Sequence, residues 1–233
     1  MVLFALWAFA ANADAWDDLK KSFTTVYTSK NISFEVDVKM YNSLVDKSPQ
    51  LNINCSSYKK DKNFYSSFMG RITICNYQTK EMMEVDENHK TIIYSIIPES
   101  HKTDTIKLPK SSSRLLHLDT SFLTNSKATY LERTSSSTII EIKPSSTSPY
   151  KSIQITLDSK SYLLKKIEYF PKKQENSVYY EHVVVDYRFN TSGLISDDIF
   201  KTHKYISRKG NEVKLKPAYL SYKLKNQLKP NKK

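Results

Sequence analysis

The chain has 233 residues, with 36 Lys or Arg against 24 Asp or Glu, so its formal net charge is +12. This length suits one large β domain or two smaller ones, and it can bury a core without a disulfide or a metal. Aromatic residues make up 12% and argue against disorder. The three glycines, Gly70, Gly193 and Gly210, lie too far apart for a Gly-rich phosphate loop, a dinucleotide fingerprint or a G-x-S-x-G nucleophile elbow, so these chemistries are excluded.

Residues 1–15 have the pattern of a secretory signal peptide. An uncharged apolar run from Met1 to Ala11 is followed by small-x-small sites that end at Ala13 and Ala15. The run is shorter than the about 20 residues that a membrane-spanning helix needs. It also lacks the basic residues with which such signals begin, which leaves two alternatives: a start codon further upstream, or a buried N-terminal helix. We predict that the mature protein is exported and soluble.

The period of the apolar residues then changes from helical to extended. Residues 16–29 carry apolar side chains at spacings of three and four, which predicts an amphipathic helix with Asp17 and Asp18 in its first turn. Residues 32–40 alternate apolar and polar side chains, which predicts a strand with one dry face.

Two hairpins should follow the first strand. We expect strands at 51–58, 63–69 and 72–78, with turns centred between Lys60 and Asp61 and, as a type II′ turn, between Gly70 and Arg71. This register pairs Cys55 and Cys75 with Ser66, and Ile53 with Phe68. It places the cysteines two strands apart, roughly 9–10 Å, which exceeds the about 7 Å that a disulfide allows. We therefore predict two free, buried thiols. The face that collects Leu51, Ile53, Cys55, Phe64, Phe68, Cys75 and Tyr77 is the predicted core side.

The rest of the chain continues the β pattern with one interruption. Strands are expected at 80–86, 91–97, 128–134, 138–143, 151–157, 161–170 and 178–189, with two weaker candidates at 202–207 and 217–225. Residues 99–127 break the periodicity, and 111–118 can form a short helix. A helical turn is expected at 197–200. Because composition shifts nowhere, residues 16–233 are predicted to be a single domain with a Lys-rich C-terminal tail.

Residue patterns for catalysis or metal binding are weak. The five histidines include no pair at metal-ligand spacing, so no metal site is predicted. His182 is expected on a strand, as a packed or edge residue. The acidic pairs Asp17/Asp18 and Asp197/Asp198 stand at helix starts, where capping explains them. No cofactor and no enzymatic activity are predicted, although the sequence does not exclude two carboxylates arranged as in a glycan hydrolase.

The positive charge is carried mostly by lysine, since arginine occurs at only five positions. Nucleic-acid sites favour clustered arginines interleaved with aromatics, and this chain lacks that pattern. A solvated surface is the simplest interpretation. Transient attraction to anionic lipid headgroups is the alternative, supported by a small cluster at Lys223, Lys225, Lys229, Lys232 and Lys233.

The order of export signal, amphipathic helix, long antiparallel sheet, helical insertion and further strands resembles the outer-membrane lipoprotein-sorting (LolA-like) superfamily. The stretches that carry the resemblance are the strand 34–40, residues 63–71 followed by Glu84-Val85-Asp86, and the hairpin from Ile155 to Ile167. It covers about residues 16–225, without a diagnostic motif. The Lys-rich C-terminus departs from the family's compact carriers.

The resemblance implies an incomplete β half-barrel of curved antiparallel sheet, with an N-terminal helix and a short helical lid or plug. It implies a bacterial periplasmic protein that binds a hydrophobic ligand or a lipoprotein acyl chain without catalysis. A cell-envelope module with a filled core is the alternative. The residues predicted to line the apolar side are Phe34, Val36, Val38, Ile53, Phe64, Phe68, Leu115, Leu116, Phe122 and Leu123.

Overall fold

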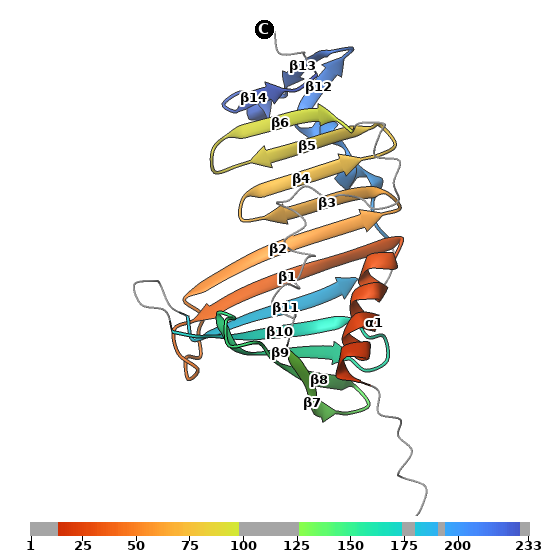
Figure 1. Cartoon of the computed structure of the whole chain (residues 1–233). Coiled ribbons are helices and arrows are strands. Elements are labelled where there is room, and N and C mark those ends of the chain that lie inside the picture. The colour runs from red at the N-terminus through yellow and green to blue at the C-terminus, as the bar shows by residue number, and fades with distance from the viewer. Residues whose placement is uncertain (1–13, 98–125, 174–179, 191–193, 229–233) are drawn as a thin grey trace, which may run out of the picture.

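The computed structural model describes residues 14–97, 126–173, 180–190 and 194–228, and its main element is a single twelve-stranded sheet (Figure 1). Two antiparallel meanders, β1 to β6 and β7 to β11, meet where β1 pairs with β11. The strand order is β14-β6-β5-β4-β3-β2-β1-β11-β10-β9-β8-β7, so β14 and β7 are the two end strands and the described sheet is not closed. The predicted fold class is confirmed, with one correction: β14 pairs parallel to β6.

The first meander follows the helix α1 (Ala15–Thr28) and consists of β1 (Asn31–Tyr41), β2 (Leu51–Lys60), β3 (Asn63–Phe68), β4 (Arg71–Asn76), β5 (Glu81–Asp86) and β6 (Thr91–Ile96). The second consists of β7 (Lys127–Arg133), β8 (Ser137–Lys143), β9 (Tyr150–Asp158), β10 (Leu164–Pro171) and β11 (His182–Asn190). The remaining elements are η2 (Asp197–Phe200), η3 (Thr202–Lys204), β12 (Ile206–Lys209), β13 (Glu212–Leu215), η4 (Pro217–Tyr219) and β14 (Lys223–Asn226).

The helix α1 begins at a residue that the sequence analysis did not select. Asp14 is its N-cap, and its carboxylate accepts a hydrogen bond from the backbone N–H of Trp16. Asp17 and Asp18 both lie in the first turn as predicted, and Asp18 is also buried. Its carboxylate accepts a 2.9 Å hydrogen bond from the hydroxyl of Tyr130 and lies 3.6 Å from Arg133, so it ties the helix to the end strand β7.

Both predicted hairpins form, but the predicted turn positions were each wrong by one residue. The turn between β3 and β4 is Met69-Gly70, with φ of 49° and 74°, so both central residues are left-handed as in a type I′ turn. Cys55 therefore pairs with Phe68, and Cys75 with Phe64. The error moves each partner by two residues, so every side chain keeps the side of the sheet that was predicted.

The two cysteines are free and buried, as predicted. Cys55 lies on β2 and Cys75 on β4, with β3 between them. Their partners Phe68 and Phe64 stand four residues apart on β3, which separates the thiols along the strand direction as well as across it.

The two larger cores of the molecule lie on opposite sides of the sheet. In β1, β2 and β7 to β11 the dry side carries α1, and we call it the helix side. In β3 to β6, Ile72 and Ile74 are buried on the side opposite to the predicted core side, and we call this side the cap side. Residues 194–228, the C-terminal cap, cover that side, as the blue segment behind β3 to β6 in Figure 1 shows.

The C-terminal cap differs from its predicted structure. The segments 202–207 and 217–225 are not continuous strands, since each begins as a short 3-10 turn and only Ile206–Lys209 and Lys223–Asn226 become extended. The hairpin partner β13 was not predicted. The turn at Asp197–Phe200 is confirmed, and it buries Phe200.

Candidate functional site

The helix side of β1, β2 and β7 to β11 is a continuous apolar surface. It follows from alternation in the sequence, because every second side chain of a strand points to the same side. One row of cross-strand partners crosses seven strands without a polar residue: Ile53, Val38, Val185, Ile167, Ile155, Ile140 and Tyr130. The adjacent row is equally apolar: Leu51, Met40, Val183, Tyr169, Ile153, Ile142 and Ala128.

Burial along these rows is graded. At the β8 to β10 end, Ile140, Ile155 and Ile167 are at most 2% exposed and pack with Ala15 and Leu19 of α1. Towards β2, Val38 and Ile53 are only half-buried. The apolar surface therefore passes from a sealed core beneath the helix to a part that keeps some accessibility.

Aromatic rings border the half-buried part. Phe34 packs against Phe189 and Tyr187, with ring centroids 5.2 and 6.2 Å apart, and Tyr150 packs against Tyr169 at 5.2 Å. Burial raises the pKa of Tyr187 and Tyr169 well above the usual value, so both phenols stay neutral at physiological pH. These side chains add apolar area without adding charge.

One cation projects to the helix side near the end of β2. In the sheet register Lys59 is the cross-strand neighbour of Ile32 on β1 and of Phe64 on β3. Burial lowers the pKa of its ammonium group. This lysine therefore stands at the margin of the apolar rows rather than within them.

The helix that borders this surface is held at its polar side. The hydroxyl of Tyr130 donates to Asp18, and burial together with this carboxylate raises the pKa of Tyr130 to about 12. The Nζ atom of Lys21 lies 3.5 Å from the centroid of the Tyr162 ring, which links the helix to the turn before β10. These contacts fix α1 at the edge of the sheet.

The other side of the same strands is polar. Asp37 accepts hydrogen bonds from Arg188 and Asn54, and the Arg188 contact contributes most to lowering the pKa of this carboxyl group. Lys39 forms a 2.8 Å ion pair with Asp186. Polar side chains thus pair with one another on the outer side, which leaves the helix side as the apolar one.

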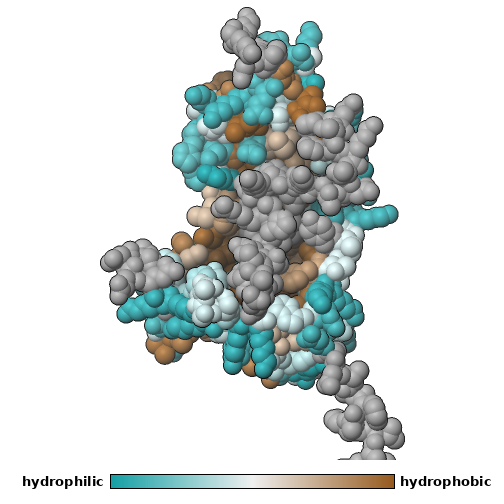
Figure 2. Space-filling view, in the orientation of Figure 1, coloured by the Kyte–Doolittle hydropathy of each residue, from teal (hydrophilic) through white to brown (hydrophobic). Residues whose placement is uncertain are grey.

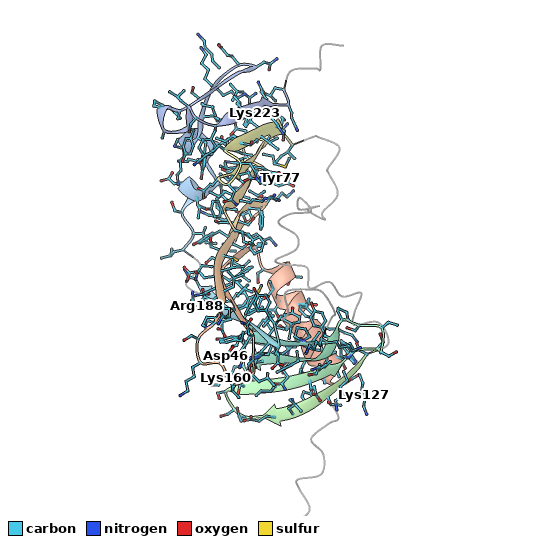
Figure 3. The ribbon with its side chains drawn as sticks, turned by 90° about the vertical axis from the view of Figure 1, so that its left-hand side faces the viewer. Asp46, Tyr77, Lys127, Lys160, Arg188 and Lys223 are labelled. Carbon is cyan, nitrogen blue, oxygen red and sulfur yellow. The ribbon has the colours of Figure 1, made fainter. Side chains whose placement is uncertain are left out.

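The shape of the molecule agrees with this division. Figure 2 shows hydrophobic surface, in brown, at the hollow in the middle of the helix side, with mostly hydrophilic surface below it and a mixture of both kinds above it. In the side view of Figure 3 the sheet bends around α1. The accessible apolar residues therefore lie in the concave part of the sheet.

The structure brings five of the predicted lining residues together. Phe34, Val36, Val38, Ile53 and Phe68 belong to the apolar cluster of the helix side, where Phe34 and Val36 are 3% and 1% exposed. Phe64 lies on the same side but belongs to a separate small cluster with Cys75 and Ile97. Leu115, Leu116, Phe122 and Leu123 lie outside the described residues, as does the predicted helix 111–118.

Sequence reasoning missed the larger share of this surface. Val183, Val185, Tyr187 and Phe189 of β11 complete the rows between β1 and β10. Their alternation was visible in the predicted strand 178–189, but nothing local indicated that this strand pairs with β1.

The other kinds of site concern metals, histidine chemistry and membrane spans. Within the described ranges, no three His, Cys, Asp or Glu side chains gather as they would around a metal ion. His182 lies on β11 as predicted, stacked on Phe170 and Tyr41 and 3.2 Å from a Glu168 carboxylate oxygen. No helix in the described part of the chain is long and apolar enough to cross a membrane.

Comparison with known proteins gives structural likeness alone. The chain resembles several solved structures at low sequence identity. A LolA superfamily protein from Nitrosomonas europaea shares 10% identity over 82% of this chain and 99% of its own, with a TM-score of 0.31. Lipoprotein LppX from Mycobacterium tuberculosis shares 9% identity over 76% of this chain and 93% of its own, with a TM-score of 0.34. A chain in the complex structure of Pseudomonas aeruginosa MucA/MucB shares 11% identity over 87% of this chain and 63% of its own, with a TM-score of 0.43. No family model and no curated protein matches the sequence.

Proposed function

We propose that this protein is an exported, non-enzymatic binding protein that carries or senses a hydrophobic ligand, a lipid or a lipoprotein acyl chain, on the helix side of its sheet. The observation that supports the proposal is the pair of apolar rows that cross seven strands and become half-buried towards Val38 and Ile53. A soluble protein rarely keeps so large an apolar surface partly accessible without a partner for it.

The dimensions of the rows suit an acyl chain. Seven strands at about 4.8 Å spacing give a row roughly 29 Å long, of which the part from β8 to β10 is sealed beneath α1. One leaflet of a bilayer's hydrocarbon core is about 15 Å deep, which approximates the reach of one lipid chain. Each methylene that leaves water contributes roughly 0.8 kcal/mol, so even part of such a row provides useful affinity after the cost of association.

Acyl-chain uptake tests this proposal directly. The protein is titrated with a long-chain fluorescent fatty acid and, separately, examined by native mass spectrometry after lipid-preserving purification. The double variant Val38→Gln/Ile53→Gln places two amides in the half-buried part of the rows and should weaken uptake at least tenfold. The matched control is Val45→Gln, because Val45 is 83% exposed in the β1–β2 loop, away from the rows.

A protein that is consistently bare and takes up no fatty acid would contradict the carrier proposal. Equal uptake by wild type, the double variant and the Val45→Gln control would place the binding elsewhere. Thermal unfolding followed by circular dichroism should show that both variants remain folded before their uptake is compared.

A second candidate is a cell-envelope structural or interaction module with a filled core. It is favoured by the near-complete burial of Phe34 and Val36, which the sequence analysis had assigned to the ligand surface. The fatty-acid titration separates the two candidates, since a filled core gives no saturable uptake.

Export and periplasmic location belong to the same proposal, as does removal of residues 1–15 as a signal peptide. Residues 1–13 lie outside the described residues, and the proposal rests here on the sequence pattern. Expression in a bacterium followed by cell fractionation and N-terminal sequencing tests it. Cleavage after Ala13 or Ala15 is the expected result, whereas an intact N-terminus in the cytoplasm would refute it.

A further inference from the structure

The C-terminal cap has two different sides. Its inner side completes the second core: Tyr205 and Ile206 are buried against Ile72, Ile74 and their neighbours. The carboxylate of Glu81 on β5 accepts hydrogen bonds from Thr202 of the cap at 2.8 Å and from Tyr94 at 2.7 Å. The cap is therefore a firmly attached layer, and its outer side is a fixed surface of the molecule.

The outer side is strongly basic. Residues 194–228 contain eight Lys or Arg and three Asp or Glu, a surplus of five positive charges in 35 residues. Each of the three acids already has a lysine partner: Asp197 with Lys60 at 2.8 Å, Asp198 with Lys201 at 2.5 Å, and Glu212 with Lys214 at 2.9 Å. The surplus is therefore not neutralised within the cap.

An apolar turn stands among these charges. Pro217, Ala218 and Leu220 are exposed around η4, and Leu220 is 72% exposed. The turn is held from beneath by Tyr219, whose ring packs against Tyr205 at 4.9 Å and Tyr222 at 5.3 Å. This aromatic support keeps Leu220 outside rather than folded into the core.

Lysines flank the turn on both sides. Lys216 precedes it, and Lys223 and Lys225 follow on β14, where alternation leaves both exposed. Among the described residues these three have no acidic partner. Lys90 adds a fourth cation, because its backbone carbonyl accepts from the N–H of Lys223 at 2.7 Å and its Nζ lies 5.0 Å from the Tyr222 ring centroid.

We propose that this surface, the cap tip formed by Leu220 with Lys90, Lys216, Lys223 and Lys225, docks the protein on membranes that contain anionic phospholipid. Lysines near an anionic bilayer each contribute about 1 kcal/mol, and an exposed leucine between them enters the interfacial region. Lysine suits headgroups as a mobile point charge, whereas recognition of nucleic acid favours the forked guanidinium of arginine. The cap contains one arginine, Arg208, and it contacts Tyr94 and Glu81.

The location of the cap tip is compatible with ligand binding at the other site. Lys223 lies at one end of the molecule in Figure 3, and Lys127 and Lys160 lie at the other end, near α1. A protein docked through the cap tip keeps its concave helix side away from the bilayer plane. The docking proposal does not rest on acyl-chain binding, and either one can fail alone.

Vesicle co-sedimentation tests the docking proposal. Wild-type protein should bind vesicles of phosphatidylglycerol and phosphatidylcholine, should release at high salt, and should not bind vesicles of phosphatidylcholine alone. The triple variant Lys216→Gln/Lys223→Gln/Lys225→Gln should bind roughly 100-fold more weakly, from about 1 kcal/mol per lysine. Leu220→Ser should weaken binding several-fold with the charge unchanged.

Two matched controls separate the cap tip from general attraction. Lys127→Gln/Lys151→Gln/Lys160→Gln removes the same charge from exposed positions on the second meander, and Leu131→Ser removes a 51% exposed leucine from β7. Both should stay within twofold of wild type, and so should the uptake-deficient Val38→Gln/Ile53→Gln variant.

Three outcomes would overturn the docking proposal. They are no binding of wild type to anionic vesicles, equal weakening by the two lysine triples, and full binding by both the cap triple and Leu220→Ser. A cap triple that loses affinity for double-stranded DNA while it keeps its vesicle binding would assign the charge to nucleic acid instead.

Discussion

The attachment of the C-terminal cap depends on one carboxylate, and its removal should be costly. The side chain of Glu81 is 15% exposed, and its oxygens accept hydrogen bonds from Tyr94 at 2.7 Å, Thr202 at 2.8 Å and Thr79 at 3.0 Å. Arg208 adds a cation 3.5 Å away. The substitution Glu81→Ala leaves the hydroxyls of the buried Tyr94 and Thr202 without their acceptor.

The magnitude follows from these two buried donors. A hydrogen bond to a charged group contributes about 1.5–3 kcal/mol, and a buried donor left without a partner costs a similar amount. Two such losses predict a decrease of roughly 3–5 kcal/mol in the free energy of unfolding. The hydrogen bond from Thr79 to Glu81 is exposed to solvent, so Thr79→Ala should lower the free energy of unfolding by less than about 1 kcal/mol.

Urea unfolding measures the effect, and a double-mutant cycle assigns it to the contact. The variants Glu81→Ala, Tyr94→Phe and their combination should show a coupling of about 1–2 kcal/mol between Glu81 and Tyr94. Limited proteolysis should cut Glu81→Ala within residues 194–228 before wild type. A loss below about 1 kcal/mol with additive single effects would refute the role given to Glu81.

The same carboxylate predicts an effect of acid. Burial opposes ionisation of Glu81, but the hydrogen bonds from Tyr94, Thr202 and Thr79 outweigh it, so the pKa is lower in the folded protein than the ordinary 4.5. Its contribution to stability is therefore complete above that value and is lost as the pH falls through the folded pKa. Wild type should lose more stability on acidification than Glu81→Ala does, and parallel acid profiles would contradict this.

Three further predictions concern the helix, a turn and the thiols. Asp18→Ala removes the acceptor of the Tyr130 hydroxyl and should lower the free energy of unfolding by roughly 1–3 kcal/mol, measured in urea, with the exposed Asp17→Ala as the near-neutral control. Gly70→Ala should cost more than Gly210→Ala in thermal unfolding, because both have positive φ but an added Cβ at Gly70 meets Asn88 at 3.0 Å; equal costs would contradict the turn geometry. Burial raises the pKa of Cys55 to about 11 and of Cys75 to about 12, so iodoacetamide at neutral pH should alkylate the folded protein at least about 100-fold more slowly than the protein in urea.

Most strands could be located from the sequence because alternation is a local property. The strand 32–40 and the hairpins around Asp61 and Gly70 were found from side-chain period and turn residues. The register was not, because moving a hairpin turn by one residue shifts each cross-strand partner by two. Such a shift leaves every residue on its predicted side of the sheet. The alternation of apolar residues is therefore the same in both registers and cannot distinguish them.

The candidate site was predictable in part for the same reason. Phe34, Val36 and Val38 could be placed on one side from their own strand. Their neighbours Tyr187 and Phe189 required the pairing of β1 with β11, two strands separated by 140 residues of chain. A contact of that range leaves no local signal in either segment.

The sequence by itself determined which residues share a side of each strand, that two thiols stay apart, and that phosphate-loop chemistries are excluded by three distant glycines. The tertiary structure alone decided which side is dry. Ile72 and Ile74 are buried on the side opposite to Val36 because the C-terminal cap covers one part of the sheet and α1 the other. The alternation of residues along a strand defines two sides. Which of these sides is buried depends on which one a distant segment covers, and this is decided only when the whole chain packs.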